Sequence, residues 1–360
     1  MSKALKITLI VAGVLILVGV MTVSLATAFS GFNCENIWKN NTFNFPWKVN
    51  IGSNNITGYK NVNNAYAADG TYTAGAESLT GIDLKWVAGS ATVSVYDGSE
   101  ITFTETSSEA LTQDVALRYG TENGVLYIQY CSTNAPDDLP MKALDVKIPA
   151  ALAASLGAFD FSGVSAQLNI SGLTVADLDC DGVSGQIDAS GLTAQTVDID
   201  TTSGEIRYEG SYVKMNVNTV SGMVRVNSTG TAQETEVDST SGAMAFAGKI
   251  GALKTNSISG EVFTDGAVYA DTADIDTTSG SVSLQFAVRP ADLKIDTISG
   301  GITLTLPTDS GFTIEYDSVS GGMDCAFSVT MSGNKYIAGD GAGRFDIGTV
   351  SGGLRIKTAQ

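Results

Sequence analysis

The chain has 360 residues, 40 of them glycine and 6 proline, and its hydrophobic content of 43% excludes wholesale disorder. Its formal net charge is −18, so the basic patch that nucleic-acid binding requires is missing. It contains no histidine, which excludes histidine-based catalytic triads, proton shuttles and zinc sites. The composition therefore predicts no nucleic-acid partner and no cofactor.

An uncharged apolar run of 23 residues extends from Ile7 to Phe29, long enough for a helix to cross a bilayer. Lys3 and Lys6 precede it, so the positive-inside rule places the short N-terminus in the cytoplasm and the rest of the chain outside. Residues 1–30 are therefore predicted to be a single-pass transmembrane anchor with an extracytoplasmic C-terminal domain. A cleaved signal peptide is the alternative, because Ala26-Thr27-Ala28 resembles a cleavage site, and the protein would then be secreted.

Three further segments differ in composition. Residues 31–80, rich in Asn, Gly, Ala and Thr, are predicted to be a linker or stalk. From Ile82 onward apolar and polar residues alternate, so 81–360 are predicted to form one β-strand-repeat domain. Its first part, 81–158, is less periodic and is expected to provide the opening coils or a cap.

A Ser-Gly pair recurs with nearly constant spacing along this domain. With the glycine taken as the mark, the copies fall at Gly185, Gly204, Gly222, Gly242, Gly260, Gly280, Gly300, Gly321 and Gly352, and a degenerate copy ends at Ala166. All intervals are 18–21 residues except the last, which is 31. A fixed period in this range is typical of stacked repeats that bury their apolar faces against their neighbours.

Each repeat carries the same columns in the same order. Two places after the mark the residue is always aliphatic: Leu168, Ile187, Ile206, Val224, Met244, Val262, Val282, Ile302, Met323 and Leu354. Because side chains alternate faces along a strand, each repeat reads as two short strands joined at the Ser-Gly bend. The pattern predicts an all-β fold, a parallel β-solenoid of about ten coils spaced about 4.8 Å apart. The long last interval predicts a normal coil plus a loop of about ten residues that caps the stack.

Two cysteines fall in inward-facing columns. Cys180 lies five places before its mark and Cys325 four places after its mark, where other repeats carry aliphatic residues. Both are predicted to be buried free thiols. A disulfide between Cys34 and Cys131 is a further, open possibility.

An acidic-or-amide column lies four places before the mark. Its members are Asp181, Asp200, Asn218, Asp238, Asn256, Asp276, Asp296 and Asp317. Stacked carboxylates repel unless a metal bridges them, so Asp181, Asp200, Asp238, Asp276, Asp296 and Asp317 form a candidate cation ladder. The alternative is an Asx-type turn, in which the side-chain oxygen accepts a backbone N–H. Asparagine at two positions keeps the acceptor and drops the charge, which favours the turn and no metal site.

Hydroxyl residues flank the β-branched position before each mark. The pairs are Thr201/Ser203, Thr219/Ser221, Ser239/Ser241, Ser257/Ser259, Thr277/Ser279, Thr297/Ser299 and Ser318/Ser320. They are predicted to face outward as a hydrogen-bonded, soluble edge. Binding of ice or glycan by this ladder is the functional alternative.

Enzymatic motifs are lacking. The repeated Ser-Gly pair has no G-x-S-x-G context, so it does not indicate a nucleophile elbow. Gly339-Asp340-Gly341-Ala342-Gly343 belongs to no strand–loop–helix unit and does not predict phosphate binding. The chain is predicted not to be an enzyme, with hydrolysis of a polysaccharide by paired carboxylates as an open alternative.

Several segments carry a family resemblance over roughly residues 80–360. They are Ile82-Asp83-Leu84-Lys85-Trp86, Leu144-Asp145-Val146-Lys147-Ile148-Pro149, the serial Asp-Thr-Thr-Ser-Gly from Asp200 and from Asp276, and the ending Thr349-Val350-Ser351-Gly352. The chain resembles the bacterial putative-adhesin β-strand-repeat family, a domain of unknown function. The resemblance implies a membrane-anchored or secreted bacterial envelope protein, and it brings no catalytic motif. Some relatives are associated with envelope-stress sensing.

These observations predict a non-enzymatic, extracytoplasmic cell-surface protein that acts in adhesion or ligand binding. Its expected partners are the cell membrane, through residues 1–30, and an envelope, glycan or cationic-peptide ligand. An envelope-stress sensing or regulatory module is the first alternative, and a carbohydrate-active enzyme is the second.

Overall fold

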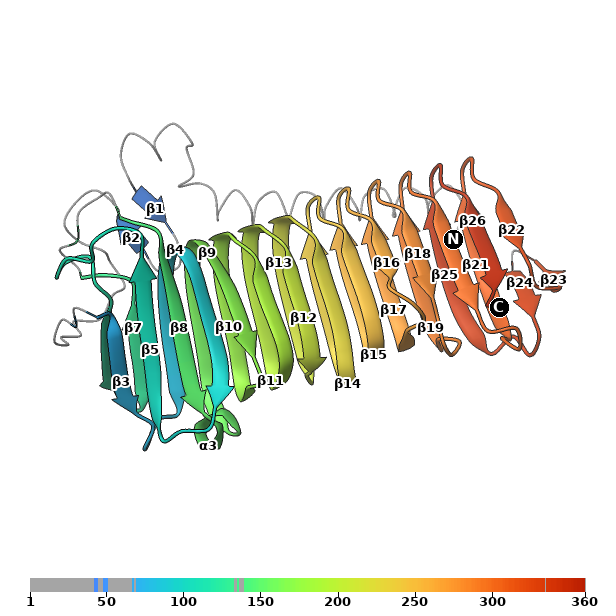
Figure 1. Cartoon of the computed structure of the whole chain (residues 1–360). Coiled ribbons are helices and arrows are strands. Elements are labelled where there is room, and N and C mark those ends of the chain that lie inside the picture. Colours follow the sequence, from blue (N-terminus) through green and yellow to red (C-terminus); the bar gives the residue numbers. More distant parts are fainter. Residues whose placement is uncertain are drawn as a thin grey trace. The chain divides into compact units, whose positions relative to one another are not determined.

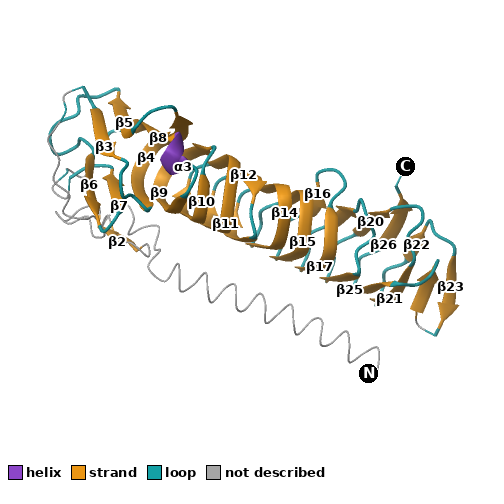
Figure 2. Cartoon of the chain, turned by 90° about the horizontal axis from the view of Figure 1, so that it is seen from below, coloured by secondary structure: helices purple, strands orange, loops and turns teal. Residues whose placement is uncertain are grey.

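The computed structural model describes residues 67, 69–132, 135, 139–333 and 335–359, together with the backbone of 42–44 and 48–50 (Figure 1). This part of the chain is nearly all strand, which confirms the predicted all-β repeat fold. Its one helix is the single turn α3 (Ala150–Ala153), drawn in purple in Figure 2. No helix among the described residues is long and apolar enough to cross a membrane, and the predicted anchor, 1–30, lies outside them.

The chain divides into two compact units whose sequence boundary falls between Ala194 and Gln195. The N-terminal unit contains β1 (Thr42–Asn44), β2 (Lys48–Asn50), β3 (Thr71–Gly75), β4 (Gly81–Tyr96), β5 (Glu100–Ser107), β6 (Arg118–Glu122), β7 (Val125–Gln129), β8 (Lys142–Pro149), β9 (Leu156–Ser171) and β10 (Thr174–Ser184). The boundary lies within β11 (Ile187–Ser203).

The C-terminal unit continues from the second half of β11. It contains β12 (Ile206–Ser211), β13 (Lys214–Ser221), β14 (Val224–Ser239), β15 (Met244–Ser257), β16 (Val262–Thr264), β17 (Tyr269–Thr277), β18 (Val282–Gln285), β19 (Asp292–Thr297), β20 (Ile302–Leu306), β21 (Phe312–Ser318), β22 (Met323–Cys325), β23 (Val329–Ser332), β24 (Lys335–Ala338), β25 (Gly343–Thr349) and β26 (Leu354–Thr358).

The coils of the C-terminal unit stack in parallel register, one repeat length apart. The predicted aliphatic stripe forms as expected, with register partners Ile206–Val224, Val224–Met244, Met244–Val262, Val262–Val282 and Val282–Ile302. Each of these side chains is at most 1% exposed. Burial of this stripe against its neighbours contributes apolar stabilisation to the stack.

The bend of each coil corrects one sequence prediction. The first hydroxyl is buried in every pair except Ser318/Ser320: Ser257, Thr277 and Thr297, for example, are at most 3% exposed. In each case the hydroxyl oxygen accepts a hydrogen bond from the N–H of the mark glycine, at 2.8–3.1 Å. Side chains alternate faces along a strand, so the hydroxyl residue two places after an inward aliphatic residue also faces inward. The N–H of the mark glycine supplies the hydrogen-bond partner that the buried hydroxyl needs.

The second hydroxyl of each pair faces outward, as predicted. It joins neighbouring coils, because Ser241, Ser279 and Ser351 donate to the carbonyl oxygens of Val220, Ile258 and Ile298 at 3.1–3.3 Å. The mark glycine is required for a steric reason. A Cβ on the glycine of one coil would collide with the carbonyl oxygen of the mark glycine in the neighbouring coil.

The N-terminal unit mixes parallel and antiparallel pairing. The long strand β4 pairs in parallel with β9 on one side and with β7 and β8 on the other. Antiparallel pairs β3–β5, β5–β8 and β6–β7 cover this end of the unit. β3 lies inside the segment predicted to be a linker, 31–80, so ordered structure begins before residue 81. The cause is the antiparallel ladder between β3 and β5, two strands that the parallel repeat does not include.

The last two coils of the C-terminal unit are stacked in the reverse of their chain order. β25 pairs with β19 on one side and with β21 on the other (Figure 1). β26 likewise lies between β20 and β22 (Figure 2). The extra residues of the 31-residue interval form the hairpin β23–β24 rather than a plain loop, and β24 pairs antiparallel with the free edge of β21. The predicted cap therefore exists, but in a different topology.

The reversed order also corrects the prediction for Cys325. Cys180 is fully buried, as predicted, whereas Cys325 is half-buried because β22 is the end strand of its sheet and pairs only with β26. Cys131 is buried, and its predicted alternative partner Cys34 lies outside the described residues.

These exposures predict different alkylation rates for the two thiols. In the native protein Cys325 should react with iodoacetamide within minutes to hours, whereas Cys180 should react only after denaturant is added. Burial also raises the pKa of both thiols, most strongly for Cys180, so little reactive thiolate forms. Mass spectrometry of timed samples measures both rates, and fast native labelling of Cys180 would contradict its inward placement.

Candidate functional site

The outer side of the sheet that leads into the bends presents three columns of polar side chains in the C-terminal unit. We call these columns, with Lys335 beside them, the charged face. In the stacking order β11, β13, β14, β15, β17, β19, β25, β21, the outer column is Thr196, Lys214, Glu234, Ala252, Thr272, Asp292, Arg344 and Thr313. The middle column is Asp198, Asn216, Glu236, Lys254, Asp274, Lys294, Asp346 and Glu315. The bend column is Asp200, Asn218, Asp238, Asn256, Asp276, Asp296, Gly348 and Asp317.

The bend column contains the predicted acidic-or-amide residues, and it brings five of the six candidate ligands into one file. Asparagine side chains act as donors between coils: Nδ2 of Asn218 donates to Asp200 at 2.7 Å, and Nδ2 of Asn256 donates to Asp238 at 2.6 Å. These two amide bonds run between coils, whereas the predicted Asx-type turn is a bond within one coil. Amide donors relieve the repulsion that adjacent carboxylates would otherwise suffer.

Further along the stack, a lysine of the middle column takes over the role that asparagine has in the bend column. Nζ of Lys294 lies 3.3 Å from Asp276 and 3.1 Å from Asp296, which are register partners. Burial raises the pKa of both carboxyls, while Lys294 opposes that rise. Burial lowers the pKa of Lys294, but its three carboxylate partners outweigh burial and raise it overall. A fixed ammonium therefore stands where a cation ladder would need a metal.

The remaining candidates lie apart from this arrangement. Asp317 is 9% exposed and is separated from Asp296 by Gly348. Asp181 lies in the N-terminal unit, beside Ser162 of β9. Across the described ranges, no three His, Cys, Asp or Glu side chains are grouped as a metal ion would require.

Replacing Asn256 with Asp tests the role of the amide. The variant loses the donor to Asp238 and places a third carboxylate between Asp238 and Asp276, so we expect a loss of about 2 kcal/mol at pH 7. The loss should shrink near pH 4, where a protonated carboxyl can donate again. Urea unfolding at both pH values measures it, with the more exposed Asn218→Asp as the milder control. Wild-type stability of Asn256→Asp in chelator would show that the amide is not structural, and recovery only with calcium would favour the cation ladder.

A groove of about 550 Å³ crosses the charged face from β14 to β21. It exists because the outer column carries two small side chains, Ala252 and Thr272, between Glu234 and Asp292. Lys254, Asp274 and Lys294 of the middle column, with Arg344, Asp346, Glu315 and Lys335, complete the lining. The groove therefore has a small, partly apolar floor and a rim of both charges.

The carboxylates at the two ends of the groove are accessible. Glu234 pairs with Lys214 at 3.1 Å and Asp292 pairs with Arg344 at 2.8 Å, and the two acidic side chains are 47% and 45% exposed. Ion pairs that are this exposed contribute about 0–1 kcal/mol each, so a ligand can exchange with them at little cost. Three coil steps separate Glu234 from Asp292, which corresponds to about 14 Å at the spacing of strands.

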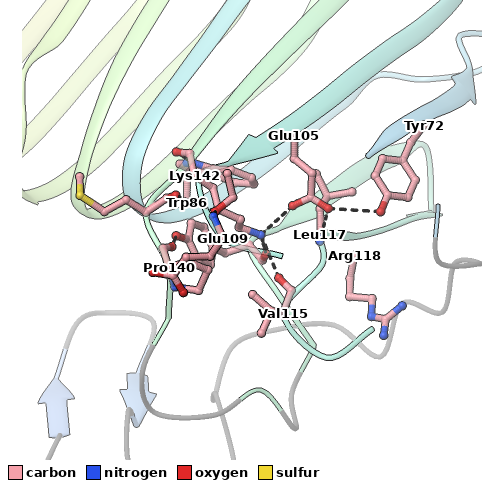
Figure 3. Close-up of polar contacts among 12 residues, drawn as sticks. Tyr72, Trp86, Glu105, Glu109, Val115, Leu117, Arg118, Pro140 and Lys142 are labelled. Atoms are coloured by element: carbon pink, nitrogen blue, oxygen red, sulfur yellow. Dashed lines mark hydrogen bonds and ion pairs between the residues drawn. The ribbon is translucent and has the colours of Figure 1, made fainter. Parts of the chain in front are cut away.

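The N-terminal unit contains a different polar cluster, which is fully buried (Figure 3). Nζ of Lys142 lies 2.8 Å from Oε2 of Glu105, and neither side chain is exposed. Lys142 also donates to the carbonyl oxygens of Val115 and Tyr130, and Glu105 accepts from the hydroxyl of Tyr72 at 3.2 Å. The backbone N–H of Leu117 also donates to Oε1 of Glu105, at 2.8 Å.

This cluster connects the antiparallel end of the unit to β4. The ammonium lies over the rings of Tyr130 and Trp86 at 4.1 and 4.9 Å, and the indole of Trp86 donates to the carbonyl of Lys142. Burial lowers the pKa of Lys142, an effect that Glu105 opposes, and burial together with Glu105 raises the pKa of Tyr72 to about 12. A saturated pair without solvent access stabilises the fold and offers no surface for a substrate.

Three carboxylates stack at strand spacing on the outer side of the N-terminal unit. Asp160 of β9 is the register partner of Asp83 in β4 and of Asp179 in β10. Burial, then Asp83 and Asp179, raise the pKa of Asp160 to about 6, although Lys85 opposes them.

The raised pKa of Asp160 predicts a pH-dependent loss of folding stability. Because the pKa of Asp160 is higher in the folded state than in the unfolded state, the native protein loses stability as the pH rises from about 4 to about 6. Asp160→Asn should therefore stabilise the protein by about 1 kcal/mol at pH 7, and the gain should vanish below pH 4. Thermal unfolding across this range measures it, with Asp145→Asn, which is exposed and faces Lys147, as the control. A gain that is equal at pH 3.5 and 7 would contradict the assignment.

Sequence reasoning found the bend column but not the groove. The signal was present, because six places before four consecutive marks the charges alternate as Glu236, Lys254, Asp274 and Lys294. Aligning this column alone would have shown that neighbouring coils carry opposite charges. No periodic signal marks Glu105 or Lys142, because both precede the regular repeats.

Comparison with known proteins gives a family and two solved structures. The Toastrack DUF4097 family model matches residues 132–265 and 248–357, which together make up more than half of the chain. A structure described as a putative adhesin from Bacteroides fragilis NCTC 9343 is 14% identical over 80% of this chain and 96% of that chain, with a TM-score of 0.38. A structure described as a putative cell adhesion protein from Clostridium sporogenes ATCC 15579 is 11% identical over 80% and 98% of the two chains, with a TM-score of 0.20. No curated protein matches this chain.

Proposed function

Because the chain belongs to the Toastrack DUF4097 family, we propose that it is a non-enzymatic, adhesion-type β-repeat protein of the cell surface that binds a basic polypeptide segment in the groove of its charged face. The extracytoplasmic location is part of this proposal and rests on the apolar run from Ile7 to Phe29. The groove between Glu234 and Asp292 is the observation that carries the binding function.

Charge supports a cationic partner. The three columns of the charged face contain twelve carboxylates and four cations, and Lys335 adds a fifth. Such an excess attracts cationic segments and speeds their association. The groove lining includes one aromatic residue, Phe345, and it is only 2% exposed, so the groove offers no ring on which a sugar or base could stack.

Spacing supports an extended peptide. Residues i and i+4 of an extended chain point to the same side and lie about 14 Å apart, which matches the distance between Glu234 and Asp292 across three coils. A peptide that runs along the stack can place one lysine on each carboxylate, with small side chains over Ala252 and Thr272. We therefore propose the groove as the binding position of the cationic-peptide ligand that the sequence predicts.

Fluorescence anisotropy with two synthetic peptides tests the proposal. The peptide Lys-Thr-Val-Thr-Lys should bind at least about fivefold more tightly than Lys-Thr-Lys-Thr-Val, which has the same composition and the wrong spacing. Glu234→Gln combined with Asp292→Asn should remove this preference. The control is Glu261→Gln. Glu261 is an exposed carboxylate that follows the mark glycine Gly260 and does not line the groove. Equal affinity for the two peptides, or an equal effect of the control, would overturn the proposal.

A further inference from the structure

The strand pair β25–β26 occupies a slot between two coils. On one side Leu293 and Ile295 of β19 are register partners of Phe345 and Ile347, and on the other side the same two residues of β25 face Ile314 and Tyr316. Leu354 and Ile356 of β26 are enclosed in the same way between β20 and β22. Phe345, Ile347, Leu354 and Ile356 are each at most 2% exposed.

This pair alone joins the segment 312–338 to the stack by strand pairing. Among the described strands, β21 pairs with β24 and β25, β22 pairs with β26, and β23 pairs with β24. None of these four strands pairs with β19 or β20. The slot therefore keeps its shape only while a strand pair fills it.

Two exposed ion pairs, each worth about 0–1 kcal/mol, favour this occupant over an unrelated strand. Arg344 of β25 bonds to Asp292 on the β19 side at 2.8 Å, and Nε of Arg355 in β26 lies 3.4 Å from Asp324 on the β22 side. The occupant thus carries one arginine for each wall of the slot. An unrelated strand with the same apolar alternation would lack both ion pairs.

The connection into the slot is short and rich in glycine. Residues 339–342 link β24 to β25, and Gly339 and Gly341 have φ values of +54° and +70°. Glycine adopts these values and extended values with little difference in energy, so the connection can open without strain. Opening would direct β25–β26 away from its own slot while leaving its side chains unchanged.

We propose that the slot also accepts β25–β26 of a second copy of this chain, which gives a strand-exchanged dimer. The incoming pair makes every contact that the resident pair makes, including both arginine pairs. Only residues 339–342 change conformation, so the exchange costs mainly the entropy of association and is favoured by high protein concentration. This inference does not depend on the groove ligand.

Disulfide trapping between two full-length variants tests the exchange. Thr305 and Lys357 are register partners on the outer side of β20 and β26, so Thr305→Cys in one chain and Lys357→Cys in the other can be linked only after exchange. Both chains also carry Cys34→Ser and Cys325→Ser. They are unfolded together, refolded at rising concentration and oxidised, and disulfide-linked heterodimer is measured on non-reducing gels.

Heterodimer should rise at least fivefold between about 1 and 100 µM chain. The matched control pairs Thr305→Cys with Arg207→Cys, an outward residue of β12, and should give no concentration-dependent heterodimer. If refolding is inefficient, the two variants are co-expressed and the same band is measured. Absence of heterodimer in correctly folded chains, or equal linkage in the control, would overturn the proposal.

Discussion

Replacing Lys142 with Met is expected to destabilise the N-terminal unit by about 3–5 kcal/mol, because it leaves the carboxylate of Glu105 buried without its charge partner. The loss reaches further than one ion pair. Lys142 also holds the carbonyl oxygens of Val115 and Tyr130, and these would lose a donor in the same variant. Urea unfolding followed by near-UV circular dichroism, which reports on Trp86 and Tyr130, measures the effect.

Two further variants isolate the cause of this loss. Lys147→Met removes an exposed lysine whose ion pair with Asp145 spans 3.6 Å, and its effect should stay within about 0.5 kcal/mol. Glu105→Gln combined with Lys142→Met removes both charges and should recover part of the stability. A loss from Lys142→Met below 1 kcal/mol would show that the pair is not desolvated as described.

Replacing Val282 with Asp should lower the stability of the C-terminal unit by at least about 4 kcal/mol. Val282 is 1% exposed and lies between Val262 and Ile302, so the new carboxylate would be buried without a partner. Thermal unfolding measured by circular dichroism should show a large drop in Tm or no folded baseline.

The neighbouring residue provides the matched control for this variant. Ser283 follows Val282 in β18 and is exposed on the outer side, so Ser283→Asp adds the same charge one residue along the chain. Its effect should be below about 0.5 kcal/mol. Comparable losses in the two variants would show that the inward and outward faces had been exchanged.

The period of the sequence was enough to predict the register of the coils but not their order in space. The aliphatic column predicted the stripe from Ile206 to Ile302, because only stacking of like on like explains residues that recur with the same chemistry. The same uniformity hides the order of the last coils. Phe345 can face Leu293 or Ile314 equally well, so the columns do not distinguish a coil that follows its predecessor from one inserted before it.

The candidate site was predicted in part for a related reason. The bend column was visible because its residues share one chemical type. The groove depends on two small residues, Ala252 and Thr272, in the outer column, whose residues share no chemical type. The inward hydroxyls were misjudged because polarity was given more weight than strand alternation. Thr297 shows which effect prevails: the N–H of Gly300 satisfies the hydroxyl, so alternation can bury it.

The serine that joins each coil to the one before it has a consequence for how this gene can change length. Ser279 donates to the carbonyl oxygen of Ile258 in the adjacent coil, and the mark glycines of successive coils stack on one another, so each coil repeats the contacts that place the next. Duplication or loss of one whole repeat of 18–21 residues between Gly222 and Gly300 would therefore yield a chain that still folds. An insertion of one residue within a strand would instead turn the following inward side chains of that strand to the solvent. Among natural relatives, length differences in this region should accordingly correspond to whole repeats. Other length differences should be confined to the segment between Gly321 and Gly352 and to the region before Leu156.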